Sequence, residues 1–163
     1  MCLWVLAGCL CQGAMASDMY LVPSTPYDIH FLQAGLTHIP TQGMPSQSME
    51  SLFAKARSFR YVADLKSRDA WQTPEETEAR YAGDCEDKAI WLFMQMKRNG
   101  YDASLVIGRA SSQSKGLHVW VESDGRVLDP TAHKRIWNAT DFPEGYYRPL
   151  YSFDGSNRYR HAA

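Results

Sequence analysis

Cysteine is almost absent from this sequence beyond its first eleven residues. Three of the four cysteines, Cys2, Cys9 and Cys11, fall in an N-terminal segment that we interpret as a leader, and the fourth is Cys85. The part expected to fold then holds one thiol, which excludes an internal disulfide. With 163 residues, a single domain can bury a core that needs neither metal nor disulfide for its stability.

An excess of charge of either sign is also absent. The 17 Lys and Arg residues are scattered along the chain and balanced by 18 Asp and Glu, which gives a formal net charge of −1. This distribution predicts neither a nucleic-acid-binding stripe nor a polybasic patch for membrane lipids. We therefore expect no nucleic-acid partner.

The hydrophobic segment at the N-terminus is too short to span a bilayer comfortably. Residues 1–16 end in Ala14-Met15-Ala16, a pattern typical of signal-peptide cleavage. Within them, Leu6-Ala7-Gly8-Cys9 resembles a bacterial lipoprotein box, in which Cys9 would carry a lipid anchor. The basic residues that usually precede either signal are missing, so a buried segment of the fold stays open as the alternative. The prediction is an export signal or lipoprotein leader, and a mature protein that is periplasmic or anchored to the membrane.

Little regular secondary structure is expected before residue 48. Residues 17–47 carry four prolines and two glycines, which predicts an irregular arm with one short strand near Ile29 to Leu32. Residues 48–163 are predicted to form a single domain. Its first helix is predicted over residues 48–65, because four apolar residues follow a helical period: Leu52, Ala56, Phe59 and Ala63.

A second, short helix is predicted from Pro74 to about Arg80. Thr73 and Glu76 have the spacing of a capping box, and Pro74 takes the first helical position, where its missing N–H costs nothing. Gly83 then ends the segment.

Cys85 is predicted to lie in the first turn of the next helix. Asp84 is the expected N-cap residue, Asp87 completes a capping-box pair, and Asn99-Gly100 ends the helix. Backbone N–H groups in a first turn have no partner within the helix, and they stabilise a thiolate. The N–H of Cys85 can also bind the oxyanion that forms when a carbonyl is attacked. The buried stripe of this helix is expected to be Ala89, Leu92, Phe93 and Met96.

Three carboxylates, those of Asp84, Glu86 and Asp87, surround the sulfur in the sequence. Like charge would raise the pKa of Cys85. Two interpretations stay open. The carboxylates cap the helix and face away from the sulfur, or their oxygens bind a cation such as Ca²⁺.

Downstream of Gly100 the hydrophobic period changes to two. Residues 104–110, 117–123 and 126–129 are predicted strands, with a polar loop at 111–116 and a tight hairpin turn at Asp124-Gly125. A two-residue turn sets Trp120 opposite Asp129. His118 shares a sheet face with Trp120, so Asp129 lies one diagonal step from His118. At that separation a carboxylate can orient an imidazole.

Cys85, His118 and Asp129 together provide a thiol nucleophile, its base and an orienting carboxylate. An isolated histidine on a strand is more often a half-buried structural residue, but the order on helix, strand and next strand favours catalysis. His133 is the nearest alternative base, although it follows Pro130 in a predicted loop. A zinc site from the same three residues is disfavoured, since no C-x-x-C or H-x-x-x-H pair is present.

Five motifs of the chain belong together in one known pattern: Trp71 to Thr77, Gly83-Asp84-Cys85-Glu86-Asp87-Lys88-Ala89, Leu117-His118-Val119, Val127-Leu128-Asp129 and Tyr147 to Phe153. In this order they resemble the bacterial transglutaminase-like cysteine peptidases, over roughly residues 50–160. The resemblance implies a papain-like α+β fold with helices packed on an antiparallel sheet.

The resemblance also implies roles for individual residues. Cys85 would be the nucleophile, His118 the general base and acid, and Asp129 the group that orients His118. Related enzymes use a side chain upstream of the cysteine as a second oxyanion donor, here Trp71 or Gln72.

The same resemblance implies that calcium can bind near the nucleophile. Some members are periplasmic proteases that release surface adhesins and hold calcium with acidic residues around the nucleophile, a neighbourhood that Asp84, Glu86 and Asp87 match. No cofactor is required for the chemistry itself. Members usually carry an aromatic residue after G-D-C-E-D, whereas this chain has Lys88, which changes the expected wall of the substrate site.

The reaction expected from these residues is acyl transfer through a thioester. Resolution by water would make the protein a protease or amidase acting on an envelope or surface protein, and resolution by a lysine amine would make it a transglutaminase. The competing hypothesis is a non-catalytic envelope module that binds peptide or peptidoglycan on the same fold.

Overall fold

The computed structural model describes residues 18–37, 39, 46–64, 70–111 and 116–162. The predicted leader at residues 1–16, with Cys9, and the middle of the predicted loop at 111–116 lie outside these residues. Among the described residues, no helix has the length and apolar character needed to cross a membrane.

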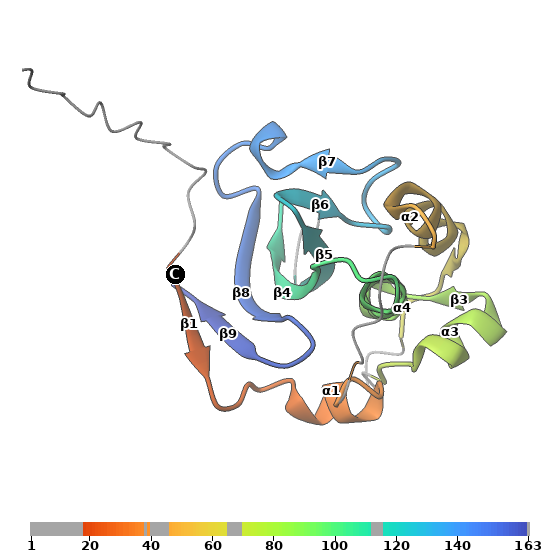
Figure 1. The fold of residues 1–163 in the computed structure, drawn as a ribbon, viewed down its shortest axis with the longest axis horizontal. Coiled ribbons are helices and arrows are strands. Elements are labelled where there is room, and N and C mark those ends of the chain that lie inside the picture. The colour runs from red at the N-terminus through yellow and green to blue at the C-terminus, as the bar shows by residue number, and fades with distance from the viewer. Residues whose placement is uncertain (1–17, 38, 40–45, 65–69, 112–115, 163) are drawn as a thin grey trace, which may run out of the picture.

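A seven-stranded sheet organises the described part of the chain (Figure 1). Every neighbouring pair of strands is antiparallel, in the order β1-β9-β8-β4-β5-β6-β7. The strands are β1 (Met19–Val22), β4 (Ser104–Ala110), β5 (His118–Ser123), β6 (Arg126–Leu128), β7 (Trp137–Asn138), β8 (Tyr147–Phe153) and β9 (Arg158–His161).

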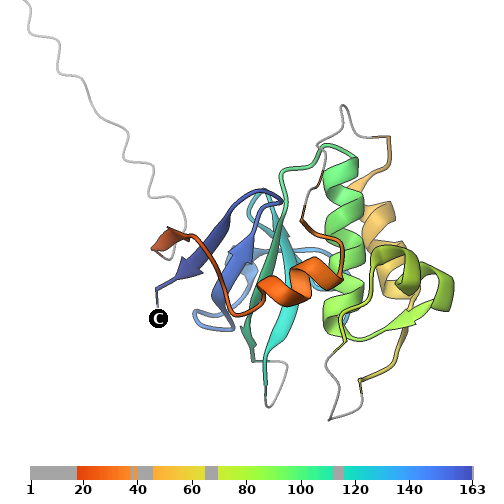
Figure 2. The same ribbon diagram turned by 90° about the horizontal axis from the view of Figure 1, so that it is seen from below.

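The helices gather on one side of this sheet, as Figure 2 shows. They are α1 (Asp28–Gln33), α2 (Met49–Ser58), α3 (Pro74–Arg80) and α4 (Cys85–Arg98). A short 3₁₀ helix, η1 (Ala139–Asp141), follows β7, and a separate parallel pair, β2 (Arg60–Tyr61) with β3 (Ala82–Gly83), precedes α4. Helices on an antiparallel sheet confirm the predicted α+β class.

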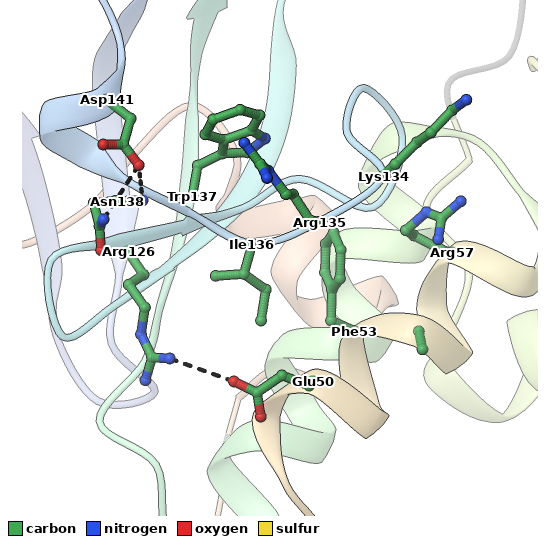
Figure 3. A pocket seen from close by; sticks show the side chains of 11 residues that line it. Glu50, Phe53, Arg57, Arg126, Lys134, Arg135, Ile136, Trp137, Asn138 and Asp141 are labelled. Carbon is green, nitrogen blue, oxygen red and sulfur yellow. Dashed lines mark hydrogen bonds and ion pairs between the residues drawn. The ribbon is translucent and has the colours of Figure 1, made fainter.

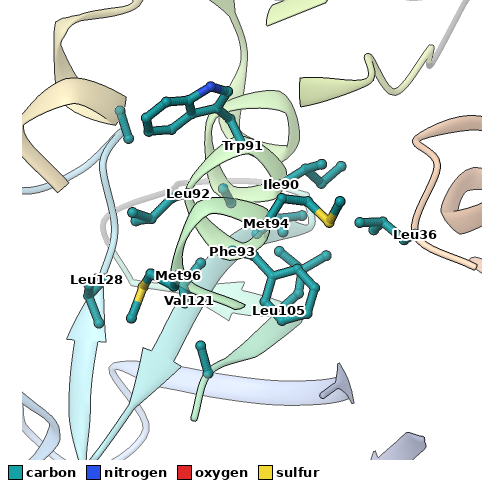
Figure 4. Close-up of a cluster of buried hydrophobic side chains, with 14 of the residues drawn as sticks. Leu36, Ile90, Trp91, Leu92, Phe93, Met94, Met96, Leu105, Val121 and Leu128 are labelled. Atoms are coloured by element: carbon teal, nitrogen blue, oxygen red, sulfur yellow. The ribbon is translucent and has the colours of Figure 1, made fainter. Parts of the chain in front are cut away.

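Helix α4 is buried on nearly every side, because α2 and α3 cover it on one side and β5 on the other. All four residues of its predicted stripe are buried, and Phe93 and Met96 pack with Leu105 and Val121 of the sheet (Figure 4). Burying a side chain of this size contributes roughly 2 kcal/mol. The packing fixes α4, and with it Cys85, rigidly against the sheet.

The local signals at the helix ends are confirmed. Thr73 Oγ1 accepts from the Glu76 N–H at 3.2 Å and the Thr73 N–H donates to Glu76 Oε2 at 2.9 Å, with Pro74 first in α3. Asp84 is the N-cap residue of α4, and its N–H donates to Asp87 Oδ2 at 3.3 Å.

The hairpin register is also confirmed. Ser123 pairs with Arg126, and both residues of the turn, Asp124 and Gly125, have positive φ, as a two-residue hairpin turn requires.

Two predicted elements were wrong. The strand near Ile29 to Leu32 is helix α1, because the Asp28 carboxylate accepts from Thr25 and Arg158 and fixes a turn at its start. The first helix ends at Ser58 rather than near residue 65. Its continuation forms β2 instead, since the Arg60 N–H donates to Tyr81 O in the pairing with β3.

Candidate active site

Cys85 is the first residue of α4, where the sequence places it, and its side chain is half-buried. Its sulfur lies against β5, because the Val119 backbone N–H hydrogen-bonds to it. Val119 directly follows His118 in the strand. The packing of α4 on β5 therefore brings the thiol to the stretch of strand that carries His118.

His118 and Asp129 form a buried pair. His118 Nε2 lies 2.7 Å from Asp129 Oδ2, and the side chains are 1% and 0% exposed. This contact is the diagonal step that the hairpin register predicts. The His118 ring also stacks on Trp120, with centroids 6.2 Å apart, so its orientation is fixed from two sides.

The Asp129 carboxylate is fully hydrogen-bonded. Oδ1 accepts from the N–H groups of Thr131 and Ala132 at 3.0 and 2.9 Å, and Oδ2 accepts from His118 and from the Tyr147 hydroxyl at 2.8 Å. Burial alone would raise the pKa of Asp129, but these donors outweigh it and lower the pKa. An ionised Asp129 accepts a hydrogen bond from the Nε2–H of His118, which leaves Nδ1 as the ring nitrogen able to accept a proton.

Tyr147 and His133 extend this chain of hydrogen bonds. The Tyr147 hydroxyl lies 2.8 Å from His133 Nε2 and donates to Asp129. Tyr147 was not predicted to belong to the site, and His133 was named only as an alternative base. The hairpin register reaches only as far as β6, and no local signal relates a residue of β8 to Asp129.

The thiol of Cys85 donates to Glu86 Oε2, at 2.9 Å, and not to His118. Burial raises the pKa of Cys85, the Glu86 charge raises it further, and the Val119 N–H opposes both. Burial and the neighbouring Asp84 charge raise the pKa of Glu86 to about 9. Burial and these neighbours therefore hold the thiol in its protonated form.

Asp64, Asp84 and Glu86 form an acidic cluster beside the sulfur. Each can contribute one carboxylate oxygen, and these oxygens lie within 4.8 Å of one another. Burial raises the pKa of Asp84, and its Oδ1 is buried without a hydrogen-bond partner. Three converging oxygens, one without a partner, fit a hard cation such as Ca²⁺.

Of the three residues predicted to hold calcium, the structure brings Asp84 and Glu86 together and directs Asp87 elsewhere. Asp87 accepts from the backbone N–H of Gln72 at 2.8 Å, from Gln72 Nε2 and from the Asp84 N–H. Asp64, and not Asp87, is the third residue of the acidic cluster. It lies 20 residues before Asp84 in the sequence, and only the β2–β3 pairing brings it close.

The two predicted oxyanion donors occupy different surroundings. Gln72 Nε2 donates to Asp87, and its Oε1 is buried without a partner. Trp71 is buried in the core, with its ring stacked on His30 at a centroid distance of 4.9 Å.

Lys88, where the related peptidases carry an aromatic residue, is 4% exposed. Burial lowers its pKa, the Arg57 charge lowers it further, and Asp129 opposes this effect. The charges of Arg57 on α2 and of Asp129 thus act on Lys88 in opposite directions.

Comparison with known proteins supports the fold. Residues 69–147 match the sequence model of the family described as the CEP76 peptidase-like domain. No curated protein matches the chain.

Among solved structures, the chain is similar to LapG of Legionella pneumophila. The calcium-bound form matches with a TM-score of 0.60 and 21% identity over 73% of this chain and 74% of that chain. The EGTA-treated form gives 0.62 and 21% over 73% and 70%, and a third LapG structure gives 0.57 and 23% over 71% of each chain. At this identity the similarity establishes the fold alone, which this chain shares with LapG.

Proposed function

We propose that the chain is a cysteine peptidase that hydrolyses a peptide or amide bond through Cys85, His118 and Asp129. The observation that carries the proposal is the buried His118–Asp129 pair, 2.7 Å apart, next to a thiol in the first turn of a helix. A purely structural histidine does not require an ionised, fully hydrogen-bonded carboxylate behind it.

In this reaction His118 Nδ1 removes the proton of the Cys85 thiol, and the thiolate attacks the carbonyl carbon. The Cys85 N–H stabilises the oxyanion, and His118 returns the proton to the leaving amine. Water then resolves the thioester, with His118 again accepting a proton. Asp129 stays ionised throughout and stabilises the imidazolium.

We further propose that calcium regulates the thiol. Asp64, Asp84 and Glu86 would hold the ion, and the Asp84 oxygen without a partner supports this assignment. When bound, the cation neutralises the charge that opposes thiolate formation and competes for the Glu86 carboxylate that now accepts from Cys85. Cys85 is then free to donate to His118.

The cellular setting rests on residues 1–16, which lie outside the described residues. The Ala14-Met15-Ala16 and Leu6-Ala7-Gly8-Cys9 patterns support export to the periplasm, with or without a lipid anchor at Cys9. A protein of the cell envelope or surface is therefore the substrate that we propose.

Alkylation of Cys85 tests the proposal without a known substrate. The protein is treated with limiting iodoacetamide at about pH 7, in calcium and in EGTA, and labelling of Cys85 is followed by mass spectrometry. We expect labelling in calcium at least about tenfold faster than in EGTA or in His118→Ala. Slow labelling that is indifferent to His118 would reject the peptidase and favour the non-catalytic binding module.

Libraries of fluorescence-quenched peptides, supplied with and without a labelled primary amine, then distinguish hydrolysis from amide exchange. Hydrolysis that Cys85→Ala abolishes supports the peptidase, whereas incorporation of the amine supports the transglutaminase alternative.

A further inference from the structure

A pocket of about 830 Å³ lies between α2 and the segment that runs into β7 (Figure 3). Pockets of this volume hold drug-sized ligands or a few amino-acid residues. Cys85, His118 and Asp129 do not line it. Phe53 and Ile136 form its apolar floor, whereas Trp137 points to the opposite side of the segment, where its ring lies against Phe142.

The rim of the pocket is basic. Four cationic side chains, Arg57, Arg126, Lys134 and Arg135, line it, against two anionic ones, Glu50 and Asp141. This concentration contrasts with the whole chain, whose formal net charge is −1. A concave site lined by one sign of charge attracts ligands of the other sign.

Both acidic residues of the rim already have partners. Glu50 pairs with Arg126, with Oε1 3.6 Å from Nη1, and Asp141 accepts from the Asn138 backbone and side chain at 3.0 and 3.2 Å. The Arg135 guanidinium lies 3.8 Å from the ring centroid of Trp137, and the two stack on the side of the segment away from Phe53 (Figure 3). Arg57 and Lys134 are exposed and have no ion pair with any described residue.

One residue of the pocket, Arg57, is linked to the proposed catalytic residues through the buried Lys88. Lys88 lies close enough to both Arg57 and Asp129 for their charges to act on it. Five positions separate Asp129 from Lys134 in the chain. The pocket and the proposed catalytic residues thus share a neighbour, Lys88, and are joined by a short stretch of chain.

We propose that this pocket binds an acidic segment of a peptide substrate, with carboxylates on Arg57 and Lys134 and an apolar side chain on Phe53 and Ile136. The proposal rests on the proposed function for the identity of the ligand as a substrate. A peptide is favoured over a nucleic acid, because the basic residues surround a pocket with an apolar floor and do not follow an extended stripe.

Binding of two labelled peptides to the full chain with Cys85→Ala tests this inference. One peptide carries several glutamates around a leucine, and the other carries glutamine at the same positions. Fluorescence anisotropy at low salt should give a Kd about tenfold lower for the glutamate peptide, and added salt should weaken its binding. Equal affinity for the two peptides would overturn the proposal.

Matched variants locate the binding. Arg57→Gln and Lys134→Gln, singly and together, should weaken binding of the glutamate peptide, by about tenfold in the pair. The control is Arg160→Gln in β9, also an exposed arginine, which should leave Kd unchanged. An unchanged Kd in the double variant, or tighter binding of a DNA duplex through the same residues, would reject the acidic peptide.

These measurements require no turnover. If Cys85-dependent hydrolysis fails while pocket binding holds, only the proposed function is lost. If hydrolysis is found and the two peptides bind equally, only the pocket assignment is lost.

Discussion

Asp129 concentrates the polar interactions of the candidate active site on one side chain. It is 0% exposed and accepts hydrogen bonds from His118, Tyr147, Thr131 and Ala132. A buried carboxylate stays ionised only when such donors compensate its lost hydration. The orientation of His118 therefore depends on residues that do not themselves touch the proposed reacting atoms.

Tyr147 is the positioning residue that the structure adds to the proposed triad. Tyr147→Phe removes one donor to Asp129 Oδ2 and keeps the ring against Trp120, whose centroid lies 4.8 Å away. We expect kcat/KM to fall about tenfold, with little change in KM, and stability to fall by about 1–2 kcal/mol, because the lost bond is to a buried charge. The acidic limb of the pH–rate profile should shift, because the loss of one donor to Asp129 changes how strongly its carboxylate stabilises the imidazolium of His118.

Tyr146→Phe is the matched control, since its side chain lies beside Tyr147 with ring centroids 5.3 Å apart and has no hydrogen bond to Asp129. It should leave both the pH profile and kcat/KM unchanged. A Tyr147→Phe variant that loses stability with an unaltered pH profile would mean that the hydroxyl is only structural.

At the scale of elements, the pairing of β4 with β8 contains an irregularity next to His118. The register shifts between Ile107 and Gly108, and Gly108 pairs with His118 on the other side. A Cβ on Gly108 would lie 2.2 Å from the Arg148 backbone oxygen and 2.8 Å from Trp120 Cη2. Only glycine allows β8 to approach this closely, which brings Tyr147 to Asp129.

Gly108→Ala should therefore destabilise the fold by about 1–3 kcal/mol, because backbone atoms must move to accept the methyl group. Urea denaturation measures the loss. Arg109→Ala, at an exposed position of the same strand, should change stability by less than about 0.5 kcal/mol. Equal stability of Gly108→Ala and the wild type would mean that β8 can shift at no cost.

The elements that the sequence predicted correctly are those whose signals are local. The Thr73–Glu76 capping box, the Asp84 cap and the Asp124-Gly125 turn each involve residues within three positions. The turn alone predicted that Asp129 lies one diagonal step from His118. The end of α2, helix α1 and the place of Tyr147 depend on partners far along the chain, such as Arg158 for Asp28. A single sequence carries no signal for such contacts.

For the whole molecule, the acidic cluster is a cost to folding when no cation is bound. Burial, with the charge of Asp84, raises the pKa of Glu86 to about 9, and burial raises that of Asp87 to about 6. Between its unfolded pKa of about 4.3 and its folded value, Glu86 keeps a proton in the folded chain that the unfolded chain has released. Stability must then fall as pH rises through this window. His133 and His161 act in the opposite sense, because burial lowers the pKa of each, but only below about pH 6.5.

The interval from about pH 7 to about pH 8 therefore excludes the contribution of these two histidines. In EGTA, the free energy of unfolding from urea titrations should fall with pH by up to about 1.4 kcal/mol per pH unit, the limit for one proton. Calcium should raise stability at the upper pH and flatten the slope, because the ion replaces that proton and binds only the folded chain. Glu86→Gln should remove the slope in EGTA and weaken the calcium effect. Stability that rises with pH in EGTA would show that Glu86 does not keep an extra proton in the folded chain. A calcium effect that survives intact in Glu86→Gln would show that this cluster does not hold the ion.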